Sequence, residues 1–364
     1  MTARDRSAAL HLRARAFVSA YEAKAAIPET FDALAADLAR FQFEHVEGYR
    51  RLVRARGVDV SAIQRAGDAP AVPTDAFKVA RVSTFPEAET PVVFRTSGTT
   101  IGARGAHWLR DVGTYDQGAL AFGRWALAHD LPADAAVLVL GPPPAEAPDS
   151  SLTHMLARFV GSLGPEVPGG SFFLENGVID LVRLDEVIAA LLVERRAALL
   201  LGTSFAFVHL LDGLDDAGFR LPPGSRVMQT GGFKGKSREV EPSVLRRDLA
   251  KAFGIDAAAI VSEYGMTELS SQFYEATAHG GAPGVYLEPP WARVVPVDPV
   301  TLVPVPEGQI GIARIEDLLN VDSAFAVLAA DRVRRSGAGF ELLGRAEGAP
   351  PRGCSIAVDE LLGR

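Results

Sequence analysis

Hydrophobic residues recur at two different spacings along the chain. In the first part they follow helical spacing, as at Phe31, Leu34, Leu38 and Phe41, and this pattern predicts helices from Met1 to about Arg56. Farther on, short continuous apolar runs alternate with helical stretches. The predicted strands are 136–140, 198–201, 226–230 and 259–263, and the predicted helices are 114–129, one that opens at 150–155, 183–196, 204–216 and 240–253. This alternation favours an α/β fold with parallel strands.

The pattern of hydrophobic runs changes after residue 284. Short β-like runs at 291–297, 309–315 and 324–329 are separated by proline and glycine. Closely spaced short strands of this kind are typical of an antiparallel sheet. The pattern therefore predicts a smaller antiparallel β sub-region beside the parallel one.

The first stretch with chemical character follows the apolar run 92–94. Its polar and glycine positions are Thr96, Ser97, Gly98, Thr99, Thr100 and Gly102. Glycine lets backbone N–H groups approach an anion, and hydroxyl groups donate hydrogen bonds to phosphate oxygens. The same residue types are also common in plain turns. Taken alone, the stretch is either a polyphosphate-binding loop or an ordinary turn.

A second stretch, Tyr264-Gly265-Met266-Thr267-Glu268, follows the strand predicted at 259–263. The ring of Tyr264 is suited to stack on a nucleobase, and the hydroxyl of Thr267 is suited to bond an α-phosphate. The carboxylate of Glu268 offers the oxygen ligands that Mg²⁺ prefers. We therefore expect this loop to complete a nucleotide site.

Together the two loops resemble those of the adenylate-forming superfamily, whose members carry a TSGTTG-type phosphate loop and a YGxTE loop. Two further segments narrow the resemblance. The run 72–78 has the form V-P-x-x-x-F-K, and a cysteine, Cys354, stands near the C-terminus. Both are similar to the acyl-protein synthetase family, the ATP-dependent component of bacterial bioluminescence fatty-acid reductase. The resemblance covers the chain from about Val72 onward.

The resemblance implies a fold and a division of the chain. The fold is the large N-terminal domain of the superfamily, with parallel sheets flanked by helices. The superfamily's small C-terminal domain, which carries an adenylation lysine, is expected to be absent. We expect a helical region at 1–70, a catalytic core at 71–345 and a short tail at 346–364. The phosphate loop departs from the motif, because Ile101 replaces a glycine and Arg104 replaces a lysine.

The resemblance also implies roles for single residues toward ATP and Mg²⁺. Asp331 would accept hydrogen bonds from the ribose, and Arg345 would lie near the ribose or the α-phosphate. Gly231 and Gly232 would lie against the adenine, and His154 would line the carboxylate pocket. The turn 231–237 is not a P-loop, since the required first glycine is replaced by Thr230. The remaining nucleotide-binding residues would be Thr96, Ser97, Gly98, Thr99, Thr100, Gly102, Arg104, Tyr264, Thr267 and Glu268, the last as the metal ligand.

The implied reaction joins a carboxylic acid, expected to be a fatty acid, to AMP and then passes the acyl group to the thiol of Cys354. The segment before Cys354, with Pro350 and Pro351, predicts an exposed loop, and Arg352 or Arg345 would favour the thiolate. Two alternatives stay open. The enzyme passes the acyl group to coenzyme A, a carrier protein or an amine, or the chain is a non-catalytic nucleotide-binding subunit.

Composition limits the partners. The formal charge is −8 and no dense basic run occurs, which argues against nucleic acid. The apolar runs are too short to span a bilayer. The single cysteine excludes an internal disulfide, and a reducing cytoplasm is the expected compartment. Besides the acid, the expected partners are an acyl reductase, an acyltransferase or a carrier protein.

Overall fold

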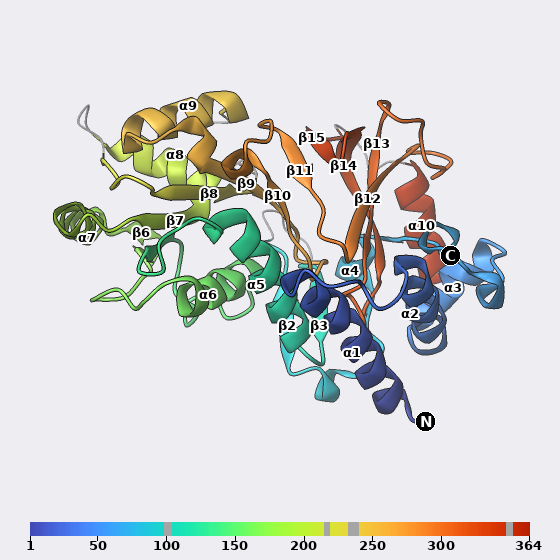
Figure 1. Cartoon of the computed structure of the whole chain (residues 1–364). Helices are drawn as coiled ribbons and strands as arrows, with labels where there is room; N and C mark the ends of the chain where they lie inside the picture. Colours follow the sequence, from blue (N-terminus) through green and yellow to red (C-terminus); the bar gives the residue numbers. More distant parts are fainter. Residues whose placement is uncertain (98–103, 215–218, 232–239, 347–351) are drawn as a thin grey trace. The chain divides into compact units, whose positions relative to one another are not determined.

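The computed structural model describes residues 1–97, 104–214, 219–231, 240–346 and 352–364. They form two compact units, which are described separately. Unit 1 comprises residues 1–121, 266–271 and 285–364, and unit 2 comprises residues 122–265 and 272–284. Elements are labelled as in Figure 1.

The helices predicted within residues 1–56 and 114–253 are present, whereas α4 and α10 were not predicted. They are α1 Ala3–Glu22, α2 Phe31–His45, α3 Glu47–Ala55, α4 Ala76–Val79, α5 Gly113–Ala128, α6 Ser151–Leu163, α7 Leu181–Glu194, α8 Ser204–Gly213, α9 Pro242–Phe253 and α10 Arg352–Leu362. Local signals explain several ends. Ser150 caps α6 by accepting from the N–H of Thr153, and Gly254, at φ 64°, ends α9.

The strands are β1 Val72–Pro73, β2 Val92–Arg95, β3 Ala106–Leu109, β4 Ala136–Leu140, β5 Leu174–Glu175, β6 Val178–Ile179, β7 Ala198–Thr203, β8 Arg226–Thr230, β9 Ile260–Tyr264, β10 Phe273–Glu275, β11 Val285–Leu287, β12 Ala292–Val297, β13 Ile310–Asp317, β14 Ala326–Ser336 and β15 Gly339–Arg345. The four strands predicted between residues 136 and 263 are all present. The runs 136–140 and 198–201 are apolar throughout, which is the pattern of a strand buried on both faces, whereas 226–230 and 259–263 also contain polar residues.

Unit 2 is built on parallel strands. Neighbouring strands follow the order β10-β9-β8-β7-β4, with β4, β7, β8 and β9 parallel and β10 antiparallel to β9. Alternate residues such as Leu138, Leu200 and Val227 form one hydrophobic core with α7, α8 and α9. Figure 1 shows α8 and α9 over one face of these strands and α6 on the other. The predicted α/β arrangement is confirmed.

Unit 1 contains the antiparallel strands predicted after residue 284. Their order is β12-β13-β14-β15-β11, with β1 added in parallel to β14. The hairpin β2–β3 forms a separate two-stranded sheet. Helix α10 packs on α3 and β1. The Nε of Arg51 donates to the carbonyl of Leu361 at 2.9 Å, and Arg56 pairs with Glu360 at 2.6 Å. Residues 352–364 of the tail are thus packed within unit 1, while the functional division at residues 70 and 345 stays a prediction.

Candidate functional site

The predicted phosphate loop joins the two strands of the β2–β3 hairpin. Just beyond the last strand pair, Thr96 and Gly105 exchange hydrogen bonds: the N–H of Thr96 donates to Gly105 O, and the N–H of Gly105 donates to Thr96 Oγ1, both at 2.9 Å. The Nε of Arg104 donates to the carbonyl of Thr96 at 2.7 Å. These bonds hold the base of the loop. Ser97 is exposed, and Gly98, Thr99, Thr100 and Gly102 lie outside the described residues.

A buried histidine links this hairpin to the second predicted loop. His107 lies on β3, opposite Phe94, and its Nδ1 is 2.9 Å from the carbonyl oxygen of Thr267. A carbonyl only accepts, so Nδ1 carries the proton. Burial lowers the pKa of His107 to about 4, which keeps the ring neutral at physiological pH. The two loops predicted to share a nucleotide are therefore joined within unit 1.

The loop that carries Thr267 and Glu268 is fixed by Asp317, the last residue of β13, and by Asn320 of the β13–β14 connection. Asp317 Oδ2 accepts from the N–H groups of Ser270 and Ser271 at 2.9 and 2.8 Å. Asn320 Nδ2 donates to the carbonyl of Glu268 at 2.9 Å. Burial raises the pKa of Asp317 to about 6, against the effect of these bonds. Glu268 as a whole residue is 6% exposed.

Asp331 and Arg345, predicted separately for the ribose side of the site, come together in unit 1. Strands β14 and β15 are antiparallel, and Asp331 is the register partner of Arg345. A register shift between Asp331 and Val333 locally interrupts the ladder. Such irregularities often redirect a side chain beside a functional site.

Three predicted residues lie in unit 2. Gly231 follows β8 directly and has a φ of 72°, a conformation that favours glycine, and its carbonyl accepts from Ser204 Oγ at 2.8 Å. Tyr264 ends β9, with its ring 6.0 Å from that of Phe273. His154 lies in the first turn of α6 and is half-buried. Gly232 lies outside the described residues.

A buried acid at the same ends of the strands was not foreseen. Glu263 precedes Tyr264 on β9, and its carboxyl is hydrogen-bonded to Thr230 Oγ1 of β8. Burial raises the pKa of Glu263 to about 7. A Cβ on Gly265 would lie 2.4 Å from Glu263 Oε1, so a larger residue there would require the Glu263 carboxyl to move. The available signal was a charged residue, Glu263, at the end of a predicted buried strand. Burying a carboxylate without a partner is energetically costly, so such a residue indicates a specific environment.

The structure corrects the prediction for Cys354. The predicted exposed loop is wrong at this residue, since Arg352, Gly353 and Cys354 form the first turn of α10 and Cys354 is only 5% exposed. Burial, followed by the charge of Asp75, raises the pKa of Cys354 to about 11. The expectation that an arginine favours the thiolate is therefore also wrong for this conformation. At neutral pH only about one thiol in ten thousand would be ionised.

The two segments that narrowed the family resemblance meet in unit 1. Residues of the V-P-x-x-x-F-K run form β1 and α4, and α10 packs on β1. Asp75 is close enough to influence the Cys354 thiol, and it pairs with Lys78 Nζ at 2.7 Å. Phe77 of the same run lies edge-on to His107, with ring centroids 6.0 Å apart. One segment thus contacts both the Cys354 environment and the histidine that joins the nucleotide loops.

A second polar cluster in unit 1 resembles a hydrolase relay. His11 Nε2 is 2.9 Å from Asp322 Oδ2, and His11 Nδ1 is 2.8 Å from Thr114 Oγ1. All three side chains are buried, with at most 4% exposure, and Arg15 Nε also donates to Thr114 Oγ1. A substrate has no access to this hydroxyl. The cluster anchors α1 and is structural.

Glu268 fits the Mg²⁺ that the resemblance implies. Mg²⁺ is usually held by one or two carboxylates together with substrate phosphates and water, not by a protein cage. Glu268 supplies such a carboxylate on a loop that is held by the hydrogen bonds of Asp317 and Asn320. In the described part of the chain, no three His, Cys, Asp or Glu residues gather into a metal-binding group.

Every helix in the described part of the chain is too short or too polar to cross a membrane.

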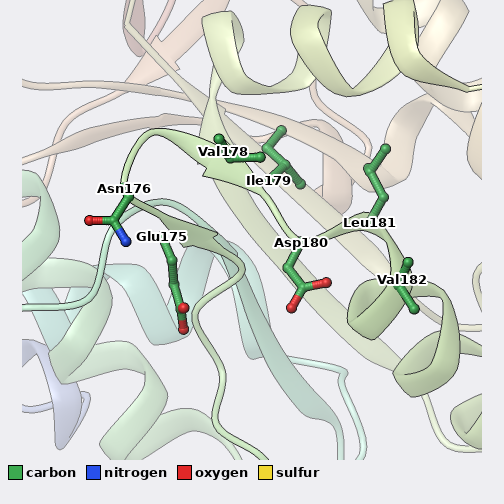
Figure 2. Close-up of a pocket in the computed structure, with 7 residues that line it drawn as sticks. All are labelled: Glu175, Asn176, Val178, Ile179, Asp180, Leu181 and Val182. Carbon is green, nitrogen blue, oxygen red and sulfur yellow. The ribbon is translucent and has the colours of Figure 1, made fainter.

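Unit 2 also carries a shallow pocket of about 570 Å³. It is lined by the β5–β6 hairpin and the start of α7, between residues 175 and 182 (Figure 2). None of the predicted site residues that the structure describes lines it. It has no role in the site described above.

Comparisons of the sequence with known proteins identify a matching family and a similar ligase. The family described as "Acyl-protein synthetase, LuxE" matches residues 1–363. The "Long-chain-fatty-acid--luciferin-component ligase" of Vibrio harveyi is 22% identical over 338 residues, which are 88% of this chain and 85% of that protein.

Two solved structures have a similar fold. An open conformation of 2-hydroxyisobutyryl-CoA ligase, in complex with 2-HIB-AMP and CoA, matches with a TM-score of 0.60 and 16% identity, over 85% of this chain and 73% of that chain. ATP-bound MatB from Rhodopseudomonas palustris matches with a TM-score of 0.50 and 18% identity, over 72% of this chain. The chain spans about half of MatB, 49% of its length.

Proposed function

This chain belongs to the acyl-protein synthetase family, and on that basis we propose that it activates a long-chain fatty acid with ATP and transfers the acyl group to a thiol. The carboxylate oxygen attacks the α-phosphorus of ATP, pyrophosphate leaves, and an acyl-adenylate forms. A thiol then attacks the acyl carbon, the bond from that carbon to the phosphate oxygen breaks, and AMP leaves with the electron pair. The thiol proton passes to solvent.

One observation carries this proposal: the hydrogen bond from His107 Nδ1 to the carbonyl of Thr267. It ties the hairpin of the hydroxyl loop to the loop of Thr267 and Glu268, which a single polyphosphate must contact together. Because His107 is neutral, it fixes position without adding charge. Phosphoryl and adenylyl transfer depend mainly on such positioning and on charge stabilisation.

In this proposal Thr96, Ser97, Thr99 and Thr100 bond the β- and γ-phosphates. Thr267 bonds the α-phosphate, and Glu268 holds Mg²⁺, which supplies charge neutralisation when bound. Asp331 accepts from the ribose hydroxyls, with Arg345 beside it. The remaining contacts come from Gly98, Gly102, Arg104, Gly231, Gly232 and Tyr264 to the nucleotide, and from His154 to the acid.

The acceptor that we propose is Cys354, the only cysteine in the chain. Its burial and raised pKa mean that transfer needs α10 to leave its place on α3 and β1. An exposed thiol has a pKa of about 8.5, which raises its ionised fraction at neutral pH by roughly two orders of magnitude. The release of α10 would therefore expose the nucleophile and activate it in one movement.

The buried state of Cys354 also favours a second candidate, in which the acyl group passes to coenzyme A, a carrier protein or an amine. In that case Cys354 is a packing residue of α10. Where the acceptor is a thiol, an acyl reductase or acyltransferase would be the next enzyme, because both consume an activated acyl group.

Pyrophosphate exchange and acyl labelling test the proposal together. We expect the purified protein to catalyse Mg²⁺-dependent exchange between pyrophosphate and ATP in the presence of a long-chain fatty acid. We also expect a hydroxylamine-sensitive acyl label on the wild type. Cys354→Ser should retain exchange and lose the label. Exchange without a label on the wild type would favour the second candidate, and ATP binding without exchange for a broad set of acids would refute activation.

A further inference from the structure

Unit 1 has a pocket of about 270 Å³ that the reaction described above does not use. Its wall presents polar and apolar surface in nearly equal amounts. The apolar side chains include Leu52 of α3, Val58, Ala71, Val297 of β12, Leu302 and Leu328 of β14. The volume is near the lower end for small-molecule sites, about 300 Å³. The pocket is therefore large enough for part of an apolar chain.

The charged groups of the pocket wall are already paired. Arg314 Nε bonds Glu316 Oε1 at 3.0 Å, and its Nη2 donates to the carbonyls of Ala66 and Ala69. Asp68 pairs with Arg65 at 3.0 Å. Arg56 pairs with Glu360. A free anion would have to compete with these partners, whereas an uncharged apolar chain would not.

Helix α10 borders the pocket at the end that carries the thiol. The N–H of Gly353 donates to Pro299 O at 2.9 Å, and a Cβ on Gly353 would lie 2.7 Å from Leu302 Cδ2. Leu302 lines the pocket, and Cys354 is the next residue after Gly353. At the other end of α10, Glu360 pairs with the pocket residue Arg56 at 2.6 Å.

Leu302 is held in an unfavourable backbone conformation at this border. Its φ is 59°, a region that bulky residues avoid. The turn is fixed by Asp298 Oδ1, which accepts from the N–H groups of Val300 and Thr301 at 3.0 and 2.7 Å. Such conformations tend to persist where the side chain is needed. Here the side chain forms the wall between the pocket and Gly353.

We propose that this pocket holds the apolar chain of an acyl group carried as a thioester on Cys354. The proposal rests on Cys354 as the acceptor in the proposed function. It adds a place where the chain is withdrawn from water after transfer. The thioester would then be shielded while α10 is docked.

The test uses alkyl disulfides, which need neither ATP nor an acid. Butyl, octyl and dodecyl methanethiosulfonate each form a disulfide with Cys354 and release methanesulfinate. The rate at which a reductant frees the alkyl thiol is then measured for each chain. Each methylene seated in the pocket shifts the equilibrium toward the seated chain by up to about fourfold. We expect the dodecyl chain to leave the wild type at least about tenfold more slowly than the butyl chain.

Val58→Trp, a half-buried position in the wall, should fill the pocket and reduce this difference to about twofold or less. Val303→Trp is the matched control, because Val303 is 59% exposed, follows Leu302 and does not line the pocket. It should keep the wild-type dependence on chain length. Cys354→Ser should form no adduct.

Three results would overturn the proposal: no dependence on chain length in the wild type, the same dependence in Val58→Trp, or no reaction of the native thiol. Since no step uses ATP, any of them can occur while pyrophosphate exchange succeeds. Failure of the pocket and failure of the proposed function are thus distinguishable.

Discussion

Asp331 and Arg345 are register partners on the antiparallel strands β14 and β15. The ribose contact predicted for one and the ribose or α-phosphate contact predicted for the other therefore originate from one place in unit 1. A ribose contact is kept from the bound substrate through the transition state, so it contributes uniform binding. We expect Asp331→Asn to raise KM for ATP about tenfold with little change in kcat. Steady-state exchange kinetics with varied ATP measure both. A fall in kcat at unchanged KM would place Asp331 away from the ribose.

Glu268 should behave differently, because charge builds up on the phosphates during the reaction. Glu268→Gln keeps the size of the side chain and removes its charge. We expect exchange to fall by about a hundredfold or more, which is typical for loss of an electrostatic catalytic group. The control is Glu307→Gln, an exposed carboxylate elsewhere in unit 1. Exchange at the wild-type rate in Glu268→Gln, at saturating and at limiting Mg²⁺, would exclude Glu268 as the metal ligand.

His107 can be tested as a positioning residue with two amides. The amide nitrogen of Asn can take the place of Nδ1, the atom that bonds Thr267, whereas that of Gln reaches toward the place of Nε2. We expect His107→Asn to keep kcat within about threefold and His107→Gln to lower it about tenfold, the effect of losing one fixed hydrogen bond. Both variants remove the imidazole, so equal losses of kcat would assign His107 to packing alone. The pKa of His107 is lowered to about 4, and pH 6 is already about two units above it. This residue should therefore add no pH dependence to kcat between pH 6 and 8.

Glu263 predicts a pH dependence of stability. Its pKa is raised to about 7 in the folded protein, so the folded state binds the proton more tightly than the unfolded state. The stabilising effect of the protonated form is complete below the unfolded pKa of about 4.3 and is lost as the pH rises to about 7. We expect Glu263→Gln to match the wild type near pH 5 more closely than at pH 8, where the variant should be more stable by up to about 3 kcal/mol.

Urea unfolding of the whole protein at several pH values measures the difference in unfolding free energy between the wild type and Glu263→Gln. Asp317 has a raised pKa in both proteins, and its contribution cancels in the comparison. A constant difference between the two proteins from pH 5 to pH 8 would contradict the prediction.

Tyr49 offers a test of stability in unit 1. Its side chain is only 2% exposed, and its hydroxyl has no hydrogen-bond partner among the described residues. A buried unsatisfied hydroxyl costs about 1–3 kcal/mol. We expect Tyr49→Phe to raise the free energy of unfolding by about 1 kcal/mol, and Tyr49→Leu to lower it through loss of the ring. A clear loss of stability in Tyr49→Phe would mean that the hydroxyl is bonded in solution.

The sequence pattern predicts the parallel strands well because a strand buried on both faces must be apolar throughout, as at 136–140. The family implied by the run 72–78 and by the tail with Cys354 is confirmed by the family match. Cys354 was misjudged for a local reason. The prolines before it predict a loop, and the helix that begins at Arg352 depends on distant contacts with Pro299, Leu302 and α3.

The supports of the site were invisible for a related reason. His107 and Asp317 act on residues 160 and 47 positions away. No spacing rule within one element connects such pairs. A motif in the sequence names the groups that touch a ligand, whereas the groups that hold the motif are chosen by the tertiary fold.

The contact of α10 with α3 has a consequence for biosynthesis. Arg51 and Leu361 are 310 residues apart, and unit 1 is assembled from three segments that alternate along the chain with the two segments of unit 2. Long-range closure is slow, and segments made early fold first during synthesis at about 5–20 residues per second. Unit 2 can therefore fold on the ribosome while the N-terminal helices wait for the last strands and α10. A chain stalled before α10 would expose the apolar faces of α3 and β1, which makes the nascent form of unit 1 a substrate for chaperones.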